Sequence, residues 1–406
     1  MTRNLLCLVT ICLLGNFTTN AQSSSSTLDV VSWNIEWFGA SFEDPANDNL
    51  QRENAKKIIR YLDADIYGLT EMVDTVQIRR LVDSLGSNYA YIISDFCSNA
   101  TAPGTNAWRN GQKLVFLYKK DIFSNVTARG MLRNSSNAYT NWASGRFPFL
   151  LNADVTIGGI TKNINFIVIH GKAGSTSDDY NRRRAGAQEL KDSLDLRYSN
   201  TNNIIFGDFN DALNQTISTA SGPETSYQPI VFDSLDADHY KSITIGLANL
   251  GQTTMINFPN VIDNHVISNE MEAYYILNTV QIRMDITNVV PDYITAHNTS
   301  DHYPVFSKYS LAGLITSVPN IPAPELGILA FPNPFIGELN IRATKKLANV
   351  QFKLINMQGQ VLAEQIVDGL NAGTTLQPKL PLLAKGIYFL QVQTKQYRTV
   401  IKLTHL

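Results

Sequence analysis

The feature that most constrains the fold of this chain is a repeated pattern, in which a short apolar run rich in β-branched residues leads into a polar side chain. The pattern occurs at Leu28–Ser32, Asp65–Leu69, Asn165–Ile169 and Asn203–Phe206. Runs of this length and composition are typical of strands that are buried on both faces. Between them, residues 50–62 and 182–198 repeat apolar side chains at helical spacing. The alternation of strands and helices predicts an α/β unit.

Polar side chains collect where these runs end, and others lie in or beside the later apolar segments 261–268 and 303–308. They are Asn34, Glu36, Glu71, His170, Asp208, Asn210, Asp263, Asp301 and His302. Folds of this kind bind ligands at one rim of the sheet, so we expect these side chains to share a site. Oxygen ligands suit Mg²⁺, with Mn²⁺ or Ca²⁺ as alternatives, rather than structural zinc. Carboxylates, imidazoles and amides around a hard cation suit the hydrolysis of phosphate esters.

Composition and missing motifs exclude several other classes of protein. The chain has no Gly-x-Ser-x-Gly nucleophile motif, no Walker loop and no His-Glu-x-x-His sequence. Charged residues make up 17% of the chain and the formal net charge is -2, so the whole chain is not a polycationic nucleic-acid binder. Two of the three cysteines, Cys7 and Cys12, lie at the N-terminus, which rules out a disulfide-built scaffold.

A proline-bearing stretch separates two predicted domains. Residues 311–324 contain three prolines, which suit a semi-rigid linker. The charge also changes there, because residues 22–324 carry 23 basic and 31 acidic residues, whereas residues 325–406 carry nine basic and four acidic ones. We predict a catalytic domain over residues 28–309, a linker over 310–324 and a second domain over 325–406.

Residues 1–21 have the features of a cleaved secretory signal. Arg3 precedes the apolar run Leu5–Leu14, and the small residue Ala21 marks the expected cleavage point. The run is too short to span a bilayer, and no other segment approaches about 18 continuous apolar residues. We therefore predict an exported protein with no transmembrane segment.

Six short motifs occur in an order that points to one family. They are SWNIE at 32–36, LTE at 69–71, IH at 169–170, GDFND at 207–211, VIDNHVIS at 261–268 and SDH at 300–302. Together they resemble the motifs of the endonuclease/exonuclease/phosphatase superfamily, which has the deoxyribonuclease-I-like fold. The resemblance covers roughly residues 28–309. It implies a two-sheet α/β sandwich flanked by helices, and a Mg²⁺-dependent phosphoesterase.

The resemblance places four of these residues at the metal site. Glu71 matches the principal metal ligand of the family. Asn34 and Asp301 match positions that complete or approach the metal site. Glu36 stands where some members carry a further carboxylate, which makes it a candidate second ligand.

Five further residues match positions that act on the reacting groups. Asp208 matches the residue that orients or activates the attacking water, with help from Asn210. His302 matches the histidine that contacts the scissile phosphate, and Asp263 its orienting carboxylate, a pairing that favours a charged ring. His170 matches a second histidine on the phosphate side.

Three residues are candidates for substrate binding. Tyr118 and Arg146 resemble less invariant rim positions of the family. Arg183 lies in a run of three arginines after the His170 loop, which suits a phosphate backbone as well as a solvated helix start. The remaining histidines that match no motif are expected to be ordinary core or surface residues: His239, His265 and His297.

A second resemblance covers nearly all of residues 325–406. The segments PNPF at 332–335, NMQGQ at 356–360, KGIYFLQV at 385–392 and IKL at 401–403 are similar to the type IX secretion sorting domain of certain Gram-negative bacteria. Their period-two apolar pattern predicts a small all-β sandwich. The resemblance implies export through the type IX secretion machinery and a secreted or cell-surface location. The alternative is a β-module that binds carbohydrate or protein.

The expected activity is that of a secreted, monomeric, metal-dependent endonuclease, which hydrolyses nucleic-acid phosphodiester bonds by metal-assisted attack of water. A phosphatase or a sphingomyelinase-like phosphodiesterase uses the same chemistry on a non-nucleic-acid substrate and remains an alternative. GDFN differs from the GDLNYR-like string of inositol polyphosphate phosphatases, which argues against that branch. A non-catalytic surface protein is the third alternative, and the intact metal- and water-handling residues argue against it.

Overall fold

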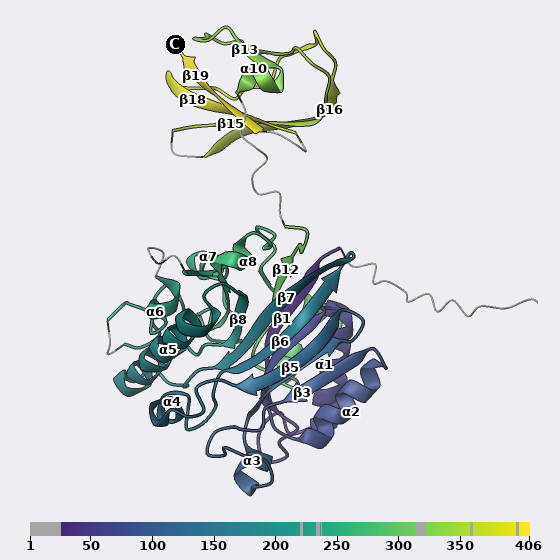
Figure 1. Cartoon of the computed structure of the whole chain (residues 1–406), viewed down its shortest axis with the longest axis vertical. Helices are drawn as coiled ribbons and strands as arrows, with labels where there is room; N and C mark the ends of the chain where they lie inside the picture. The colour runs from purple at the N-terminus through teal and green to yellow at the C-terminus, as the bar shows by residue number, and fades with distance from the viewer. Residues whose placement is uncertain are drawn as a thin grey trace, which may run out of the picture. The chain divides into compact units, whose positions relative to one another are not determined.

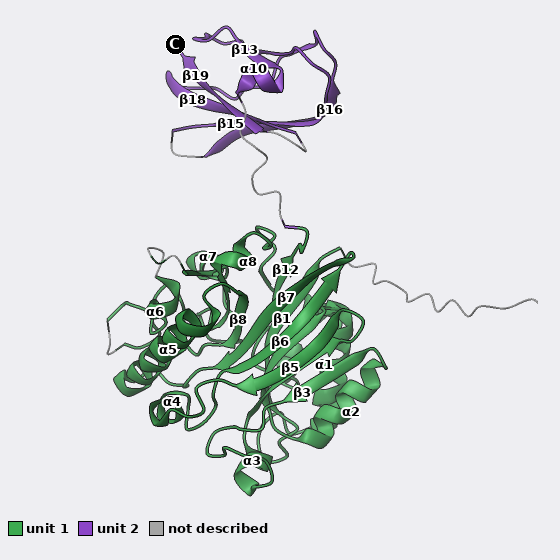
Figure 2. Cartoon of the chain, viewed as in Figure 1, with its two compact units in different colours: residues 1–312 green, residues 313–406 purple. Residues whose placement is uncertain are grey.

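The chain divides into two compact units, residues 1–312 and 313–406 (Figure 2). The computed structural model describes residues 26–219, 222–232, 236, 238–313, 322–357, 360–394 and 398–406. The predicted signal over residues 1–21 lies outside the described residues, as do residues 314–321 of the predicted linker. Among the helices in these ranges, none combines the length and apolar composition needed to cross a bilayer.

The first unit is built on two six-stranded sheets (Figure 1). The first sheet has the strand order β11 (Gln281–Ile282), β12 (Val305–Tyr309), β1 (Leu28–Phe38), β2 (Ile66–Met72), β4 (Lys113–Lys119) and β3 (Tyr89–Ile93). The second has the order β5 (Phe123–Gly130), β6 (Phe149–Ile157), β7 (Ile160–His170), β8 (Asn202–Asp208), β10 (Asp263–Ser268) and β9 (Tyr240–Ser242). This arrangement confirms the predicted two-sheet α/β sandwich.

Helices cover the outer faces of both sheets (Figure 1). The long ones are α1 (Asp48–Leu62) and α2 (Thr75–Leu85) on the first sheet, and α5 (Ser177–Tyr198) on the second. The short ones are α3 (Asn106–Asn110), α4 (Ser136–Asn141), α6 (Gln228–Val231), α7 (Ile245–Asn249), α8 (Asn269–Glu272), α9 (Tyr293–Ala296) and a 3₁₀ helix over Met284–Asn288.

The two predicted helical segments are helices, and local capping sets where they begin. The Asn47 side chain accepts a hydrogen bond from Leu50 N and starts α1 two residues before the predicted segment. Helix α5 begins five residues earlier than predicted, because Thr176 and Asp179 form a reciprocal capping box. The apolar spacing alone could not show this polar first turn.

The core lies mainly between the two sheets, where apolar side chains of both meet. Gly68 on β2 makes this close approach possible, because a Cβ atom there would lie 2.4 Å from Val168 and 2.5 Å from Phe206. A second cluster packs α1 and α2 onto the outer face of the first sheet. The sheets are therefore held face to face, and residues at one edge of each can reach residues of the other.

The second unit begins with a short helix, α10 (Ala323–Leu326), which strands follow along the described residues. One antiparallel sheet has the order β13 (Ile328–Phe331), β14 (Asn340–Ala343) and β17 (Thr375–Leu376). The other has the order β16 (Val361–Leu370), β15 (Leu347–Ile355), β18 (Gly386–Gln393) and β19 (Arg398–His405). Their inward apolar residues form one cluster, as the predicted all-β domain requires.

Candidate active site

Strand pairing brings the polar strand ends to one rim of the first unit. β7 and β8 are parallel, and His170 and Asp208 are register partners at their C-terminal ends. β10 runs antiparallel to β8, so its first residue, Asp263, lies opposite Asp208. On the other sheet β1 and β2 are parallel, and Asn34 and Glu71 lie near their ends. The rim therefore collects residues from both sheets.

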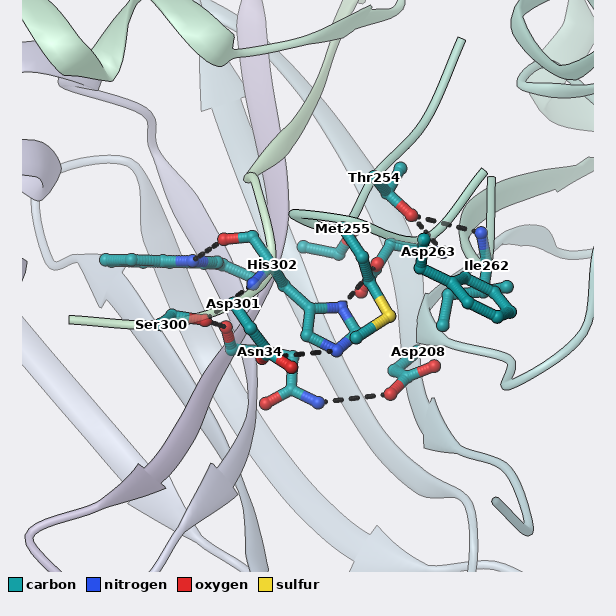
Figure 3. A network of polar contacts seen from close by, with 12 residues as sticks. Asn34, Asp208, Thr254, Met255, Ile262, Asp263, Ser300, Asp301 and His302 are labelled. Carbon is teal, nitrogen blue, oxygen red and sulfur yellow. Dashed lines mark hydrogen bonds and ion pairs between the residues drawn. The ribbon is translucent and has the colours of Figure 1, made fainter. Parts of the chain in front are cut away.

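The Asn34 side chain joins the two halves of this rim (Figure 3). Its Nδ2 donates to Glu71 Oε1 at 3.1 Å and to Asp208 Oδ2, also at 3.1 Å. Glu71 belongs to the first sheet and Asp208 to the second, so this amide spans the gap between the sheets. Its Oδ1 accepts from Glu36 N at 3.0 Å, which fixes the orientation of the amide.

The backbone at this rim adopts conformations that residues other than glycine rarely take. Positive φ angles occur at Glu36 (20°), Trp37 (44°), Glu71 (60°) and Asn210 (51°). Such conformations are unfavourable unless the surrounding structure enforces them, and they cluster at functional sites. Three of these residues were predicted for the site from the sequence.

Glu71, His170 and Asp208 form one group of closely spaced ligand atoms. His170 Nε2 lies 3.6 Å from Glu71 Oε1 and 3.5 Å from Asp208 Oδ2. One ligand atom from each residue lies within 4.8 Å of the other two. Burial, followed by the charges of Arg146 and His302, holds the pKa of His170 well below its ordinary value. The ring is therefore neutral, which is the form that can bind a metal.

Asp208 is the most heavily constrained carboxylate of the site. Its Oδ1 accepts from Asn210 N at 2.8 Å, and its Oδ2 accepts from Asn210 Nδ2 at 3.1 Å. Burial, followed by the neighbouring Asp263 carboxylate, raises the pKa of Asp208 to about 7 even though His302 opposes the shift. This carboxylate can therefore exchange a proton near neutral pH.

His302 and Asp263 form a buried imidazole–carboxylate pair (Figure 3). His302 Nδ1 and Asp263 Oδ2 lie 2.7 Å apart. Burial alone would lower the pKa of His302, but the Asp263 carboxylate outweighs it and the pKa stands well above its ordinary value. This pairing favours the charged form of the ring. Its Nε2 lies 3.7 Å from Asp301 Oδ1.

Glu36 turns toward a histidine that no motif contains. Its Oε2 lies 2.7 Å from His297 Nε2. Burial, followed by the nearby Asp301 carboxylate, raises the pKa of Glu36 to about 7. His297, expected from the sequence to be ordinary, thus borders the site through Glu36. It stands three residues before the SDH motif at 300–302 and belongs to no motif itself, so only the tertiary structure shows its contact with Glu36.

Arg146, which was predicted to bind substrate at the rim, is buried beside the carboxylates. Its Nη1 donates to Gln112 Oε1 and its Nη2 to Gly171 O, both at 2.6 Å. Burial lowers the pKa of Arg146, and the charges of Glu71 and Asp208 oppose the shift. Its Nε is buried without a hydrogen-bond partner among the described residues. Arg146 therefore supplies fixed positive charge behind the acidic cluster.

Tyr118, predicted to bind substrate, lies at the end of β4 away from Glu71. β4 runs antiparallel to β2, and Tyr118 lies opposite Ile66, the first residue of β2. Glu71 lies at the other end of β2, near Met72, whose partner is Lys113. The Tyr118 ring instead packs near the Phe123 ring, with their centroids 5.5 Å apart.

Arg183, a candidate for substrate binding, has a fully buried side chain. Its Nη1 donates to Lys172 O at 2.8 Å and to Gly174 O at 2.7 Å. Its Nε lies 3.8 Å from Asp211 Oδ2, a carboxylate that is itself fully buried. Arg183 therefore contacts both the loop after His170, at Lys172 and Gly174, and the loop after Asp208, at Asp211.

We expect the Arg183→Met variant to lose about 1–3 kcal/mol of unfolding free energy, because the change removes the donor to the carbonyls of Lys172 and Gly174, while Asp211 keeps its hydrogen bonds from Ser226. Urea denaturation followed by circular dichroism measures the loss. The matched control is Arg184→Met, since Arg184 Nη1 pairs with the exposed Glu224 carboxylate at 3.0 Å and such pairs contribute about 0–1 kcal/mol. Equal losses in the two variants would contradict the assignment.

The residues of the site fit a divalent cation. Glu71 and Asp208 offer carboxylate oxygens and His170 offers a neutral imidazole nitrogen, and their ligand atoms are mutually close. A cation would also offset the burial and crowding of carboxylates that raise the pKa of Asp208. A second close group, Asp208, Asp263 and His302, contains the charged ring and is less suited to a cation.

Two packed sheets with an acidic, histidine-bearing rim define a hydrolase of the deoxyribonuclease-I-like fold class. Residues 31–302 match the Endonuclease/Exonuclease/phosphatase family, so the chain belongs to this family. Residues 329–404 match the Secretion system C-terminal sorting domain, so the second unit is a sorting domain of this type. No curated protein matches the chain.

Several solved structures are similar to the first unit at low sequence identity. An endonuclease/exonuclease/phosphatase from Bacteroides vulgatus is 14% identical, with 70% of this chain and 99% of that chain covered and a TM-score of 0.48. The human nocturnin catalytic domain is 17% identical, with 70% and 94% covered and a TM-score of 0.46. A mannosyl-6-phosphatase from Bacteroides thetaiotaomicron is 15% identical, with 70% and 99% covered and a TM-score of 0.43. None of these similarities bears on the substrate of this chain.

Proposed function

We propose that the first unit is a divalent-metal-dependent endonuclease that hydrolyses phosphodiester bonds of nucleic acid. The observation that carries the proposal is the pairing of functions around Asp208. This carboxylate accepts from Asn210 N and from Asn34 Nδ2, and it belongs to two groups of mutually close side chains, one with Glu71 and His170 and one with Asp263 and His302. A proton acceptor next to a cationic donor suits attack of water on a phosphate diester.

Each residue has a distinct part in the proposed reaction. Asp208, held by Asn210, accepts a proton from the attacking water. His302, held by Asp263, donates hydrogen bonds to the scissile phosphate, where negative charge develops. Glu71, with His170, would hold Mg²⁺, and Asn34 fixes the Glu71 and Asp208 carboxylates relative to each other. The cation, when bound, neutralises phosphate oxygens and stabilises the leaving oxygen.

One observation favours the alternative of a smaller phosphoester, cleaved by a phosphatase or a sphingomyelinase-like phosphodiesterase. All three arginines expected to meet a phosphate backbone are engaged within the protein. Arg182 donates to Thr140 O, Arg183 is buried, and Arg184 pairs with Glu224. The same catalytic residues would serve such a substrate without a long basic surface.

We expect the purified chain to nick supercoiled plasmid DNA in Mg²⁺ and to lose this activity in EDTA, because removal of the cation leaves the phosphate charge uncompensated. Agarose gels of plasmid, and parallel assays with RNA, sphingomyelin and a small phosphomonoester, measure the outcome. Re-addition of Mg²⁺ after EDTA is the control for irreversible damage. Intact plasmid together with cleavage of the lipid or monoester would replace the endonuclease by the alternative, and activity that persists in EDTA would contradict the metal requirement.

We further propose that residues 1–21 direct export and that the sorting domain engages type IX secretion machinery of a Gram-negative bacterium. The match of residues 329–404 supports this location. The enzyme would then act outside the cell, either released or held at its surface.

A further inference from the structure

We propose that Gln51 is a positioning residue of the active site. Its buried amide holds the end of β1, which carries Asn34 and Glu36, in register with the loop that carries Asp301 and His302. The inference rests on the proposed function, since it concerns the same site. No motif includes Gln51, and its part follows from contacts that only the folded chain makes.

Gln51 lies where an apolar residue would be expected. It occupies the inner face of α1, one turn before Asn54 and Ala55 and two turns before Ile58, and it is 0% exposed. A buried amide is unfavourable unless its donors and acceptor are satisfied. A polar side chain on this buried stripe therefore needs a specific set of partners.

The Gln51 amide has such partners on two separate segments. Its Nε2 has two hydrogens; it donates to Glu36 O at 2.7 Å, at the end of β1, and the neighbouring Ile35 O lies 3.2 Å from the same nitrogen. The same nitrogen donates to Thr299 O at 3.1 Å, two residues before Asp301. Its Oε1 accepts from Gly39 N at 3.0 Å, which fixes which end of the amide faces the three carbonyls.

The end of β1 needs this support because its regular pairing fails there. The register between β1 and β2 shifts between Asn34 and Phe38. Glu36 and Trp37, within the shift, have positive φ angles. Backbone groups in such a bulge leave the strand ladder and need other partners. Gln51 supplies such a partner to the Glu36 carbonyl.

The supported segments meet again at the catalytic residues. Ser300 Oγ donates to Asn34 O at 2.7 Å and accepts from His302 N at 2.9 Å. Asn34 in turn reaches Glu71 and Asp208. A shift of either segment therefore moves the Glu71 and Asp208 carboxylates relative to His302. Asn54 adds a second tie from the same helix, because its Nδ2 donates to Thr299 Oγ1 at 3.0 Å.

The test compares Gln51→Met with Gln77→Met in the full chain. Both changes replace a buried glutamine by an unbranched side chain of similar length, but the Gln77 amide contacts Arg52 on α1 rather than the backbone of the site. We expect Gln51→Met to weaken Mg²⁺ binding at least about tenfold and to lower kcat by a similar factor, with KM within about threefold of native. Gln77→Met should change neither. Calorimetric titration with Mg²⁺ and steady-state kinetics give these values, and thermal melts compare the folds.

Two outcomes decide the inference. Native Mg²⁺ affinity and native kcat in folded Gln51→Met would overturn it, as would equal losses in both variants. If Gln51→Met does not fold, Gln51→Asn decides by the same measurements, because it keeps the amide but is too short to reach both segments. A native chain that binds Mg²⁺ and cleaves no phosphoester would refute the proposed function, while the comparison of Mg²⁺ affinities would still test Gln51.

Discussion

The Asp208→Asn variant is expected to hydrolyse its substrate at least about a hundredfold more slowly than the native chain, since removal of a positioned general base typically costs about 10²–10⁴-fold in rate. Asparagine keeps the size of the side chain and can still accept from Asn210 N, whose donor lies 2.8 Å from Asp208 Oδ1. Asparagine cannot take a proton from water, and the change removes one negative charge from the group formed by Glu71, His170 and Asp208. The value to measure is kcat at saturating Mg²⁺.

A matched control separates this effect from a general change of charge. Asp178→Asn makes the same substitution at an exposed position in the first turn of α5. We expect native turnover from this control and a native circular dichroism spectrum from both variants. Activity of Asp208→Asn within tenfold of native would refute the assignment of Asp208 as the proton acceptor.

The Asp263→Asn variant should lose about a hundredfold in kcat/KM at pH 8 and less at pH 6. In the native chain the Asp263 carboxylate, 2.7 Å from His302 Nδ1, overcomes the effect of burial and holds the pKa of His302 well above its ordinary value. Without the Asp263 carboxylate the pKa of His302 falls, and the His302 ring loses its proton at a lower pH. The pH profile of kcat/KM should therefore show its alkaline limb displaced to lower pH.

The loss of unfolding free energy in Asp263→Asn should also depend on pH. The folded-state pKa of His302 is raised, so the pairing contributes its full stability below the unfolded value of about 6.5 and loses it as the pH rises through the folded-state pKa. Asp263→Asn should therefore destabilise the fold more at pH 6 than at high pH. Glu272→Gln is the control, because Glu272 Oε1 lies 3.3 Å from His239 Nε2 outside the site. An unchanged rate profile in Asp263→Asn would contradict the proposed charge on His302.

The sequence predicted the layers of the fold well, because strands and helices leave periodic patterns. Apolar runs gave the central strands of both sheets, and helical spacing gave α1 and most of α5. The first turn of α5 was missed, since the Thr176–Asp179 capping box is polar and carries no apolar period. Strands β3, β4, β5 and β6 were not among the predicted runs, although they fill much of the two sheets.

The candidate site was predictable where a residue sits inside an ordered motif. Nine polar residues at strand ends were expected to share a rim, and pairing of parallel strands brings His170 next to Asp208 and Asn34 next to Glu71. Their individual catalytic parts stay predictions until the variants are measured. Tyr118 was placed by weaker similarity, and strand direction puts it at the end of β4 away from Glu71.

The sequence by itself determined the fold class, the division of residues between two folded units and the chemical character of the rim, because these depend on local periodicity and residue type. The tertiary structure alone decided which charges are buried and what they touch. The structure shows that Arg183, a candidate phosphate contact, is buried near Asp211. It also shows that Gln51 hydrogen-bonds to both the end of β1 and the segment before Asp301. Such contacts join residues up to 248 positions apart, and no local pattern in a chain records a distance of that kind.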